Sequence, residues 1–204
     1  MKIGLILNNF SVSKDRNYLW STIQDTVVHY KYALQDVSVF GCASGFRNSI
    51  SNTYFDELYT STAGTIESQH NNPKLITKAI NSCKSHECEK ILFINPYYRI
   101  KNFDFLDSKI AMLLEDKEYA EDRIRSRNIS FDFLYGPTDF ISKAWEKQPW
   151  NYKIQEPSQN LFSKINNLSG SRKILSEGSF FTKKDLSIQE IKVFWKSNIK
   201  YINH

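Results

Sequence analysis

The 204 residues suffice for one domain with a substantial core, and 41% hydrophobic with 24% charged residues excludes disordered and fibrous classes. No apolar run approaches the ~20 residues that span a membrane, and three cysteines favour reduced thiols and a cytoplasmic location. The net charge of +5 comes entirely from residues 151–204, which favours a solvated basic surface over a site for nucleic acid or an anionic membrane.

Alternation of strand and helix patterns begins at the first residues. Lys2–Leu7 is an apolar run typical of a buried strand, and it ends at Asn8-Asn9. Helical spacing of apolar residues predicts a helix over Tyr18–Leu34, and period-two alternation predicts a strand over Asp36–Gly41. The following residues, 41–67, read as one long polar connection.

The middle of the chain continues the alternation. Pro73 opens a helix that runs to about Cys83, because proline suits the first helical turn. Ile91–Ile94 is continuously apolar, as in a central parallel strand. Apolar spacing predicts a helix over Phe103–Glu118, and Phe131–Tyr135 predicts a strand that turns at Gly136-Pro137.

The last third contains four further predicted elements: a helix over Ile141–Glu146, a helix over Ser158–Leu168, a strand over Lys173–Leu175 and a helix over Leu186–Ile202. We therefore expect residues 1–204 to form one α/β domain with a basic helical part from about residue 151. Its sheet is Rossmann-like and mostly parallel, with helices on both faces. Ligands of such sheets bind at the carboxyl ends of the strands. We place those ends at Asn8-Asn9, Gly41-Cys42, Asn95-Pro96-Tyr97 and Tyr135-Gly136.

Several common enzyme motifs are missing. The first βα turn has no GxGxxG, and the chain has no P-loop, no GxSxG nucleophile elbow and no HExxH zinc motif. Cys83, His86 and Cys88 lie within six residues, but their spacing matches no standard zinc pattern and favours a polar helix end.

Two segments carry candidate chemistry. Arg123, Arg125 and Arg127 are able to grip a phosphate group, although the acidic residues just before them favour charge pairing on an exposed face. Asp132 lies between aromatic residues near a strand end, where a desolvated carboxylate serves as a base. A turn-capping role for Asp132 is an equal alternative.

Four segments together resemble small bacterial and viral glycosyltransferases of the capsular-polysaccharide or lipopolysaccharide type, which have a GT-A-like fold. The opening resembles theirs in Trp20-Ser-Thr22 and Asp36–Gly41, and Ile91–Ile100 looks like their central strand. Phe131–Gly136 is similar to their acceptor-side segment, and Ser176-Glu-Gly178 to the site of their late glutamate. The resemblance implies transfer of a sugar from a nucleotide sugar to a hydroxyl of a glycan, a lipid-linked glycan or a modified nucleic acid.

The resemblance breaks at the metal site. Such enzymes end the central strand in Asp-x-Asp, which holds Mn²⁺ or Mg²⁺, and here the position reads Asn95-Pro-Tyr97. Neutral side chains balance a divalent cation poorly. The alternatives are arginine or lysine in place of the metal, or a fold kept without the usual catalysis. Asp104 and Asp107 are possible substitute ligands, with placement at a helix start favoured.

The site predicted from these residues has a donor part and a catalytic part. The donor part comprises Asn8, Asn9, Arg16, Asn95, Arg99 and Arg123, and the proton acceptor is Asp132 or Glu177. The competing classes are a nucleotide-binding or nucleic-acid-binding module without chemistry, and an inactive partner subunit.

Overall fold

The computed structural model describes residues 1–12, 17–45, 54–61, 73–96, 99–100, 102–119, 124–146, 172–175 and 180–181. The main sheet consists of β1 (Ile3–Val12), β2 (Val37–Gly45), β3 (Glu57–Ser61), β4 (Lys90–Ile94), β6 (Ile110–Tyr119), β7 (Ile124–Pro137) and β8 (Arg172–Leu175). A second sheet pairs β5 (Arg99–Ile100) with β9 (Phe180–Phe181). The described helices are α1 (Asn17–Leu34), α2 (Pro73–Ser85), α3 (Thr138–Glu146) and the short 3-10 helix η5 (Asp104–Asp107).

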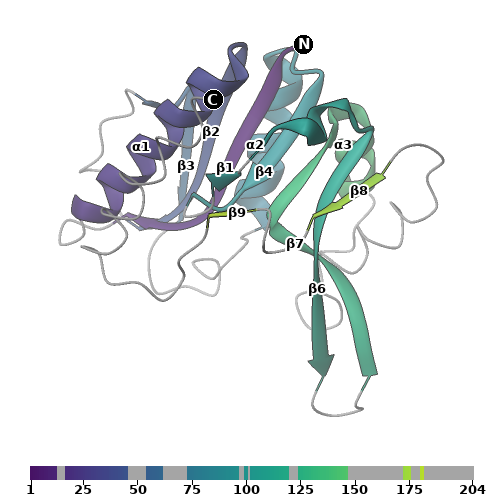
Figure 1. The fold of residues 1–204 in the computed structure, drawn as a ribbon. Helices are drawn as coiled ribbons and strands as arrows, with labels where there is room; N and C mark the ends of the chain where they lie inside the picture. Colours follow the sequence, from purple (N-terminus) through teal and green to yellow (C-terminus); the bar gives the residue numbers. More distant parts are fainter. Residues whose placement is uncertain are drawn as a thin grey trace.

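The main sheet has the strand order β3-β2-β1-β4-β7-β6-β8 (Figure 1). Strands β1 to β4 are mutually parallel, and β8 is parallel to β6. Strand β7 is antiparallel to both of its neighbours, β4 and β6. The sheet is therefore mostly parallel with one reversed strand, which confirms the predicted α/β class.

The order of the strands reverses at β1. From β1 the chain passes through α1 to β2 on one side, and from β3 it passes through α2 to β4 on the other side. The carboxyl ends of β1 and β4 are thus neighbours at a topological switch point, where open α/β sheets bind their ligands.

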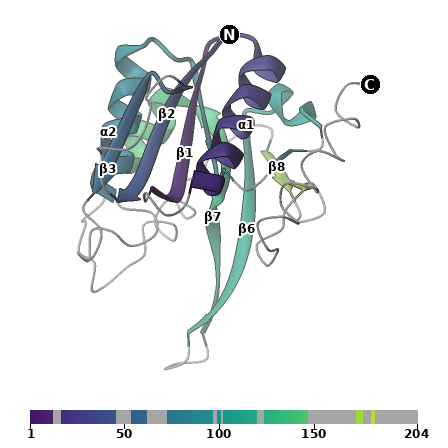
Figure 2. The same ribbon diagram turned by 90° about the vertical axis from the view of Figure 1, so that its left-hand side faces the viewer.

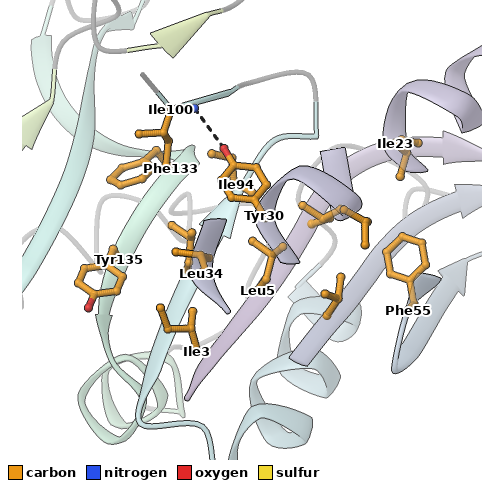
Figure 3. Close-up of a cluster of buried hydrophobic side chains, with 14 of the residues drawn as sticks. Ile3, Leu5, Ile23, Tyr30, Leu34, Phe55, Ile94, Ile100, Phe133 and Tyr135 are labelled. Atoms are coloured by element: carbon orange, nitrogen blue, oxygen red, sulfur yellow. Dashed lines mark hydrogen bonds between the residues drawn. The ribbon is translucent and has the colours of Figure 1, made fainter. Parts of the chain in front are cut away.

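Helix α1 covers one face of the sheet because its buried residues recur at helical spacing. Ile23, Val27, Tyr30 and Leu34 pack on a cluster that includes Leu5 of β1 (Figure 3). Helices α2 and α3 cover the other face, where Ile76, Ile80 and Trp145 pack among side chains of β1, β2 and β4. Figures 1 and 2 show the sheet between these two helical layers.

The predicted helix over Phe103–Glu118 is wrong. The structure has the short helix η5 there, followed by the ten-residue strand β6. Ala, Met and Leu favour helices in isolation, but tertiary context overrides that weak preference. Ile110, Ala111 and Met112 are consecutive and all buried, as expected for a strand inside a sheet that is covered on both faces.

Four other features differ from the predictions. The polar connection 41–67 contains strand β3, whose buried Leu58 was hidden among polar neighbours. Strands β1 and β2 extend further than predicted, to Val12 and Gly45. The chain does not turn at Gly136-Pro137, because β7 continues through Gly136 and leads directly into α3.

Strands β6 and β7 continue beyond the sheet as a two-stranded arm (Figures 1 and 2). On one side of the arm, Asp116 lies opposite Arg127 and Glu118 lies opposite Arg125 in the strand register. Opposite charges at facing positions stabilise antiparallel pairs. The register thus places opposite charges at facing backbone positions, and charge pairing and phosphate binding by these arginines both stay predictions.

The predicted helices over Ser158–Leu168 and Leu186–Ile202, and with them most of the basic part from residue 151, lie outside the described residues. The predicted last strand is confirmed as β8. Among the described helices, none is long and apolar enough to cross a membrane.

Candidate functional site

Strands β1, β4 and β7 are neighbours at the centre of the sheet, and the backbone pairing that joins all three ends at the same residue of β4. Leu7 of β1 and Phe133 of β7 both pair with Ile94 of β4. One position further toward the carboxyl edge of β1 and β4 lie three residues that we call the terminal row: Asn8, Asn95 and Asp132. The fold therefore gathers three predicted site residues from distant parts of the chain at the switch point of the sheet.

Two of these strands become irregular at the terminal row. Asn8 and the residue after it lie opposite the single residue Cys42 of β2, which makes a β-bulge. In β7, residues 130–133, which include Asp132, lie opposite the single residue Leu113 of β6. Bulges are over-represented next to active sites, where they redirect side chains. Because of these two bulges, the backbone at Asn8 and at Asp132 departs from the position that regular strand pairing would give it.

Asn8 and Asn95 are buried, with 1% and 3% of their surfaces exposed. Burying an amide is unfavourable unless it is hydrogen-bonded. An asparagine side chain offers two donor hydrogens and one acceptor oxygen. Such an amide is neutral and directional, a chemistry that suits the uncharged polar groups of a base, a ribose or a sugar.

Contacts from α1 fix the segment that follows β4. The Thr26 hydroxyl donates a hydrogen bond of 2.8 Å to the Pro96 carbonyl oxygen, in a buried position. The Tyr30 hydroxyl accepts a hydrogen bond of 3.3 Å from the Ile100 amide (Figure 3). Arg99, whose backbone pairs in β5 with β9, is therefore held between these two anchors along the chain.

Thr26 was missed in the sequence. It interrupts the apolar stripe of α1 between Ile23 and Val27, and it is fully buried. A polar residue at a core position of a helix signals a specific hydrogen-bond partner, but the partner itself lies 70 residues away. The sequence therefore indicates that Thr26 has a hydrogen-bond partner, but it does not identify that partner as Pro96.

Asn8 and Asn95 do not supply the ligands of a Mg²⁺ or Mn²⁺ site. Both terminal amides are neutral, whereas these cations favour carboxylate oxygens. Asp107, considered as a substitute ligand, lies near the Tyr135 hydroxyl, whose pKa is raised to about 12 mainly by burial and further by the Asp107 charge. That hydroxyl also contacts Met1, at the amino edge of the sheet. The described residues contain no group of three or more metal-ligating side chains.

The end of β7 was assigned to the wrong edge. Tyr135-Gly136 was predicted at the ligand-binding edge, but Gly136 pairs with Ile91 near the start of β4 because β7 is antiparallel. Reversal of the same strand brings Asp132 to the ligand-binding edge instead. Asp132 lies within the strand, so a turn-capping role is excluded.

The other predicted site residues are less fully described. Asn9 lies in the β1 bulge, and its side chain is outside the described part of the structure. Arg16, Arg123 and Glu177 lie outside the described residues. Their predicted roles, like those of Arg99 and Asp132, remain predictions.

A separate polar network connects β3 to α2. The Glu57 carboxylate accepts hydrogen bonds from the Tyr59 and Ser82 hydroxyls, the latter at 3.1 Å, and lies 3.3 Å from His86 Nε2. The Tyr59 hydrogen bond is the main cause that lowers the pKa of Glu57, and burial raises that of Tyr59 to about 12. The network fixes the end of α2 to an edge strand and engages the His86 ring with Glu57.

No family model matches the chain, and no curated protein matches it. Solved structures do match over almost the whole length. The 4-diphosphocytidyl-2C-methyl-D-erythritol synthase from Anaerococcus prevotii has a TM-score of 0.52 at 11% identity, over 98% of each chain. The 2-C-methyl-D-erythritol 4-phosphate cytidylyltransferase from Thermus thermophilus has a TM-score of 0.54 at 8% identity, over 97% of this chain and 98% of that chain. The chain thus has the Rossmann-like fold of these two proteins.

Proposed function

We propose that this chain binds a nucleotide sugar at the terminal row and transfers the sugar to a hydroxyl acceptor. The observation that carries the proposal is the meeting of Asn8, Asn95 and Asp132 at the switch point of the sheet. Such a switch point is where open α/β folds bind their ligands. The fold shared with nucleotidyltransferases supports a nucleotide as that ligand.

Two kinds of side chain bind the donor in this proposal: neutral amides and positively charged arginines. The Asn8 and Asn95 amides hydrogen-bond the base, ribose or sugar, where no charge has to be balanced. The diphosphate carries negative charge, and we assign its neutralisation to Arg99, with Arg16 or Arg123 assisting. Arg99 follows Asn95 by four residues, in the segment that Thr26 and Tyr30 anchor to α1.

In the transfer step, the acceptor hydroxyl oxygen forms a bond to the anomeric carbon while the bond from that carbon to the diphosphate oxygen breaks. Asp132 or Glu177 takes the hydroxyl proton, and the nucleoside diphosphate leaves with the bonding electron pair. Arginine stabilises the negative charge that develops on the leaving group. The position of Asp132 in a bulge beside Asn95 makes it the preferred base of the two.

Donor binding is tested by thermal shift and calorimetric titration with a panel of nucleotides and nucleotide sugars, each with Mn²⁺ and with a chelator. A ligand at a hundredfold excess over its dissociation constant stabilises the folded state by about 2.7 kcal/mol. We expect one nucleotide sugar to bind equally in both conditions. Asn95→Ala should weaken it by roughly tenfold or more, since a buried hydrogen bond is lost. Asn81→Ala, on the exposed side of α2, is the matched control and should bind normally.

Catalysis is tested with the donor so identified. Asp132→Asn should lower the transfer rate by about 10²–10⁴-fold while donor binding stays within a factor of two or so, because a general base acts only in the chemical step. Asp25→Asn, an exposed change on α1, should leave both unchanged. Binding without turnover in the unaltered protein would support the binding-module or inactive-subunit classes, and absence of binding to the whole panel would overturn the donor site.

Nucleotidyl transfer is the second candidate function, and the likeness to a cytidylyltransferase favours it. In that reaction a nucleoside triphosphate reacts with a phosphate acceptor and releases pyrophosphate. The leaving group separates the two candidates: pyrophosphate from a triphosphate indicates nucleotidyl transfer, and a nucleoside diphosphate from a nucleotide sugar indicates glycosyl transfer.

A further inference from the structure

Helix α2 ends in a tight turn that brings two cysteines together. The Cys88 amide donates a 2.9 Å hydrogen bond to the Cys83 carbonyl oxygen, and the Glu87 amide donates a 3.0 Å hydrogen bond to that of Lys84. Glu87 has a φ of 58°, in the left-handed region. These features define a Schellman motif, in which the residues in the positions of Cys83 and Cys88 usually make a hydrophobic contact.

The backbone of this turn permits a disulfide. The 2.9 Å hydrogen bond, extended by the covalent bonds on either side, limits the separation of the two Cα atoms to about 7 Å. Two cysteines are bridged without backbone movement only within about that separation. The turn therefore meets the distance requirement by its own hydrogen bonding.

Both thiols occupy the space above Gly4 of β1. A Cβ placed on Gly4 would lie 2.4 Å from Cys83 Sγ and 3.3 Å from Cys88 Sγ. The two thiols also share a side-chain hydrogen bond. Their sulfur atoms are therefore neighbours, and the missing side chain at Gly4 provides the room that both use.

The two thiols differ in environment. Cys83 is fully buried, whereas Cys88 has 5% of its surface exposed. The hydrogen bond from Cys83 and the charge of Lys2 lower the pKa of Cys88, while burial raises that of Cys83. Since the thiolate is the reactive species, Cys88 is the nucleophile of the pair.

We propose that Cys83 and Cys88 form a peroxide-sensitive dithiol that closes to an intramolecular disulfide. The Cys88 thiolate attacks one oxygen of hydrogen peroxide, which gives Cys88 sulfenic acid and hydroxide, and the hydroxide is protonated to water. Cys83 Sγ then attacks Cys88 Sγ, loses its proton and displaces a second water. Two thiols and one peroxide thus yield one disulfide and two waters.

The pair is tested on the full chain by treatment with hydrogen peroxide, followed by alkylation under denaturing conditions, intact mass and peptide mapping. We expect the oxidised chain to be about 2 Da lighter than the reduced chain before alkylation, and after alkylation to carry one alkyl group where the reduced chain, with its three cysteines, carries three. We also expect a tryptic fragment linking Cys83 to Cys88 that dithiothreitol separates. Cys42→Ser is the matched control and should form the same link. A link that includes Cys42, or no link at doses that oxidise exposed methionine, would overturn the proposal.

The order of attack is tested with single variants and dimedone, which traps sulfenic acid. Cys83→Ala should accumulate dimedone on Cys88, because the resolving thiol is gone. Cys88→Ala should leave Cys83 unmodified at the same dose. Should either variant misfold, the mapped link in the unaltered chain still decides whether the disulfide forms, and dimedone on Cys83 in place of Cys88 would reverse the assigned roles.

Discussion

Gly4→Ala provides a direct test of the packing between β1 and α2. The new methyl group would lie 2.4 Å from Cys83 Sγ and 3.1 Å from Cys83 Cβ, both closer than normal contact. Cys83 is buried in α2, so the clash is relieved only by movement of the helix or by an unfavourable rotamer. Overpacking of this kind lowers the free energy of unfolding by about 1–3 kcal/mol. Replacing a glycine inside a strand raises it by about 0.5–1 kcal/mol, because the unfolded chain loses conformational freedom. We therefore expect a net loss of about 1–2 kcal/mol in the free energy of unfolding, or roughly 2–8 °C in Tm for a chain of this size.

The assay is urea unfolding of Gly4→Ala, Cys83→Ala and the double variant. If the sulfur contact is the cause, the double variant should be more stable than the sum of the two single effects predicts, by about 0.5 kcal/mol or more. Gly136→Ala is the control, because its new Cβ would approach no atom closer than 3.3 Å. Additive effects, or a Gly4→Ala protein as stable as the parent, would refute the reasoning.

Three further predictions concern hydrogen bonds. Tyr30→Phe should lower the free energy of unfolding by about 1–3 kcal/mol in urea titrations, because the buried Ile100 amide loses its 3.3 Å acceptor; no loss would mean that water or another group replaces it. Trp145→Phe removes the 2.8 Å bond from Nε1 to the Thr77 hydroxyl and should cost about 0.5–1.5 kcal/mol beyond any change in packing, a difference that should disappear in a Thr77→Ala background. The lowered pKa of Glu57 means that its carboxylate stabilises the fold above the ordinary value of 4.5 and that this contribution is lost as the pH falls toward the folded pKa. Melting curves should show Glu57→Gln less stable than the parent at pH 7, with the gap narrowing below pH 4.5, and a constant gap would contradict this assignment.

Local patterns predicted the parallel half of the sheet. The strands around Leu5 and Ile91–Ile94, and the helices on either side of them, follow from periodicity because one stripe or one run of residues is buried. The same patterns placed Asn95 directly after its strand, but they ended the first strand at Asn8, which lies within β1. Their adjacency needed one further assumption, that the strands are parallel neighbours, which the sheet confirms.

The antiparallel part of the sheet, around β6 and β7, could not be predicted from local sequence patterns. Ile110–Leu114 has the composition of a helix, and only pairing with β7 and β8 makes it a strand. The reversal of β7 is a long-range choice, and with it the position of Asp132 beside Asn95 was invisible in the sequence. Asp132 was therefore proposed from a supposed turn at Gly136 that the structure does not have, and its role stays a prediction.

Strand β7 runs without a break from the tip of the arm, at Ile124, through the bulge at Asp132 and on into α3. A change in the direction of the arm relative to the sheet must be absorbed where β7 is least tied to its neighbours, which is the bulge itself. The inclination of the arm and the backbone position of Asp132 are therefore coupled through one strand.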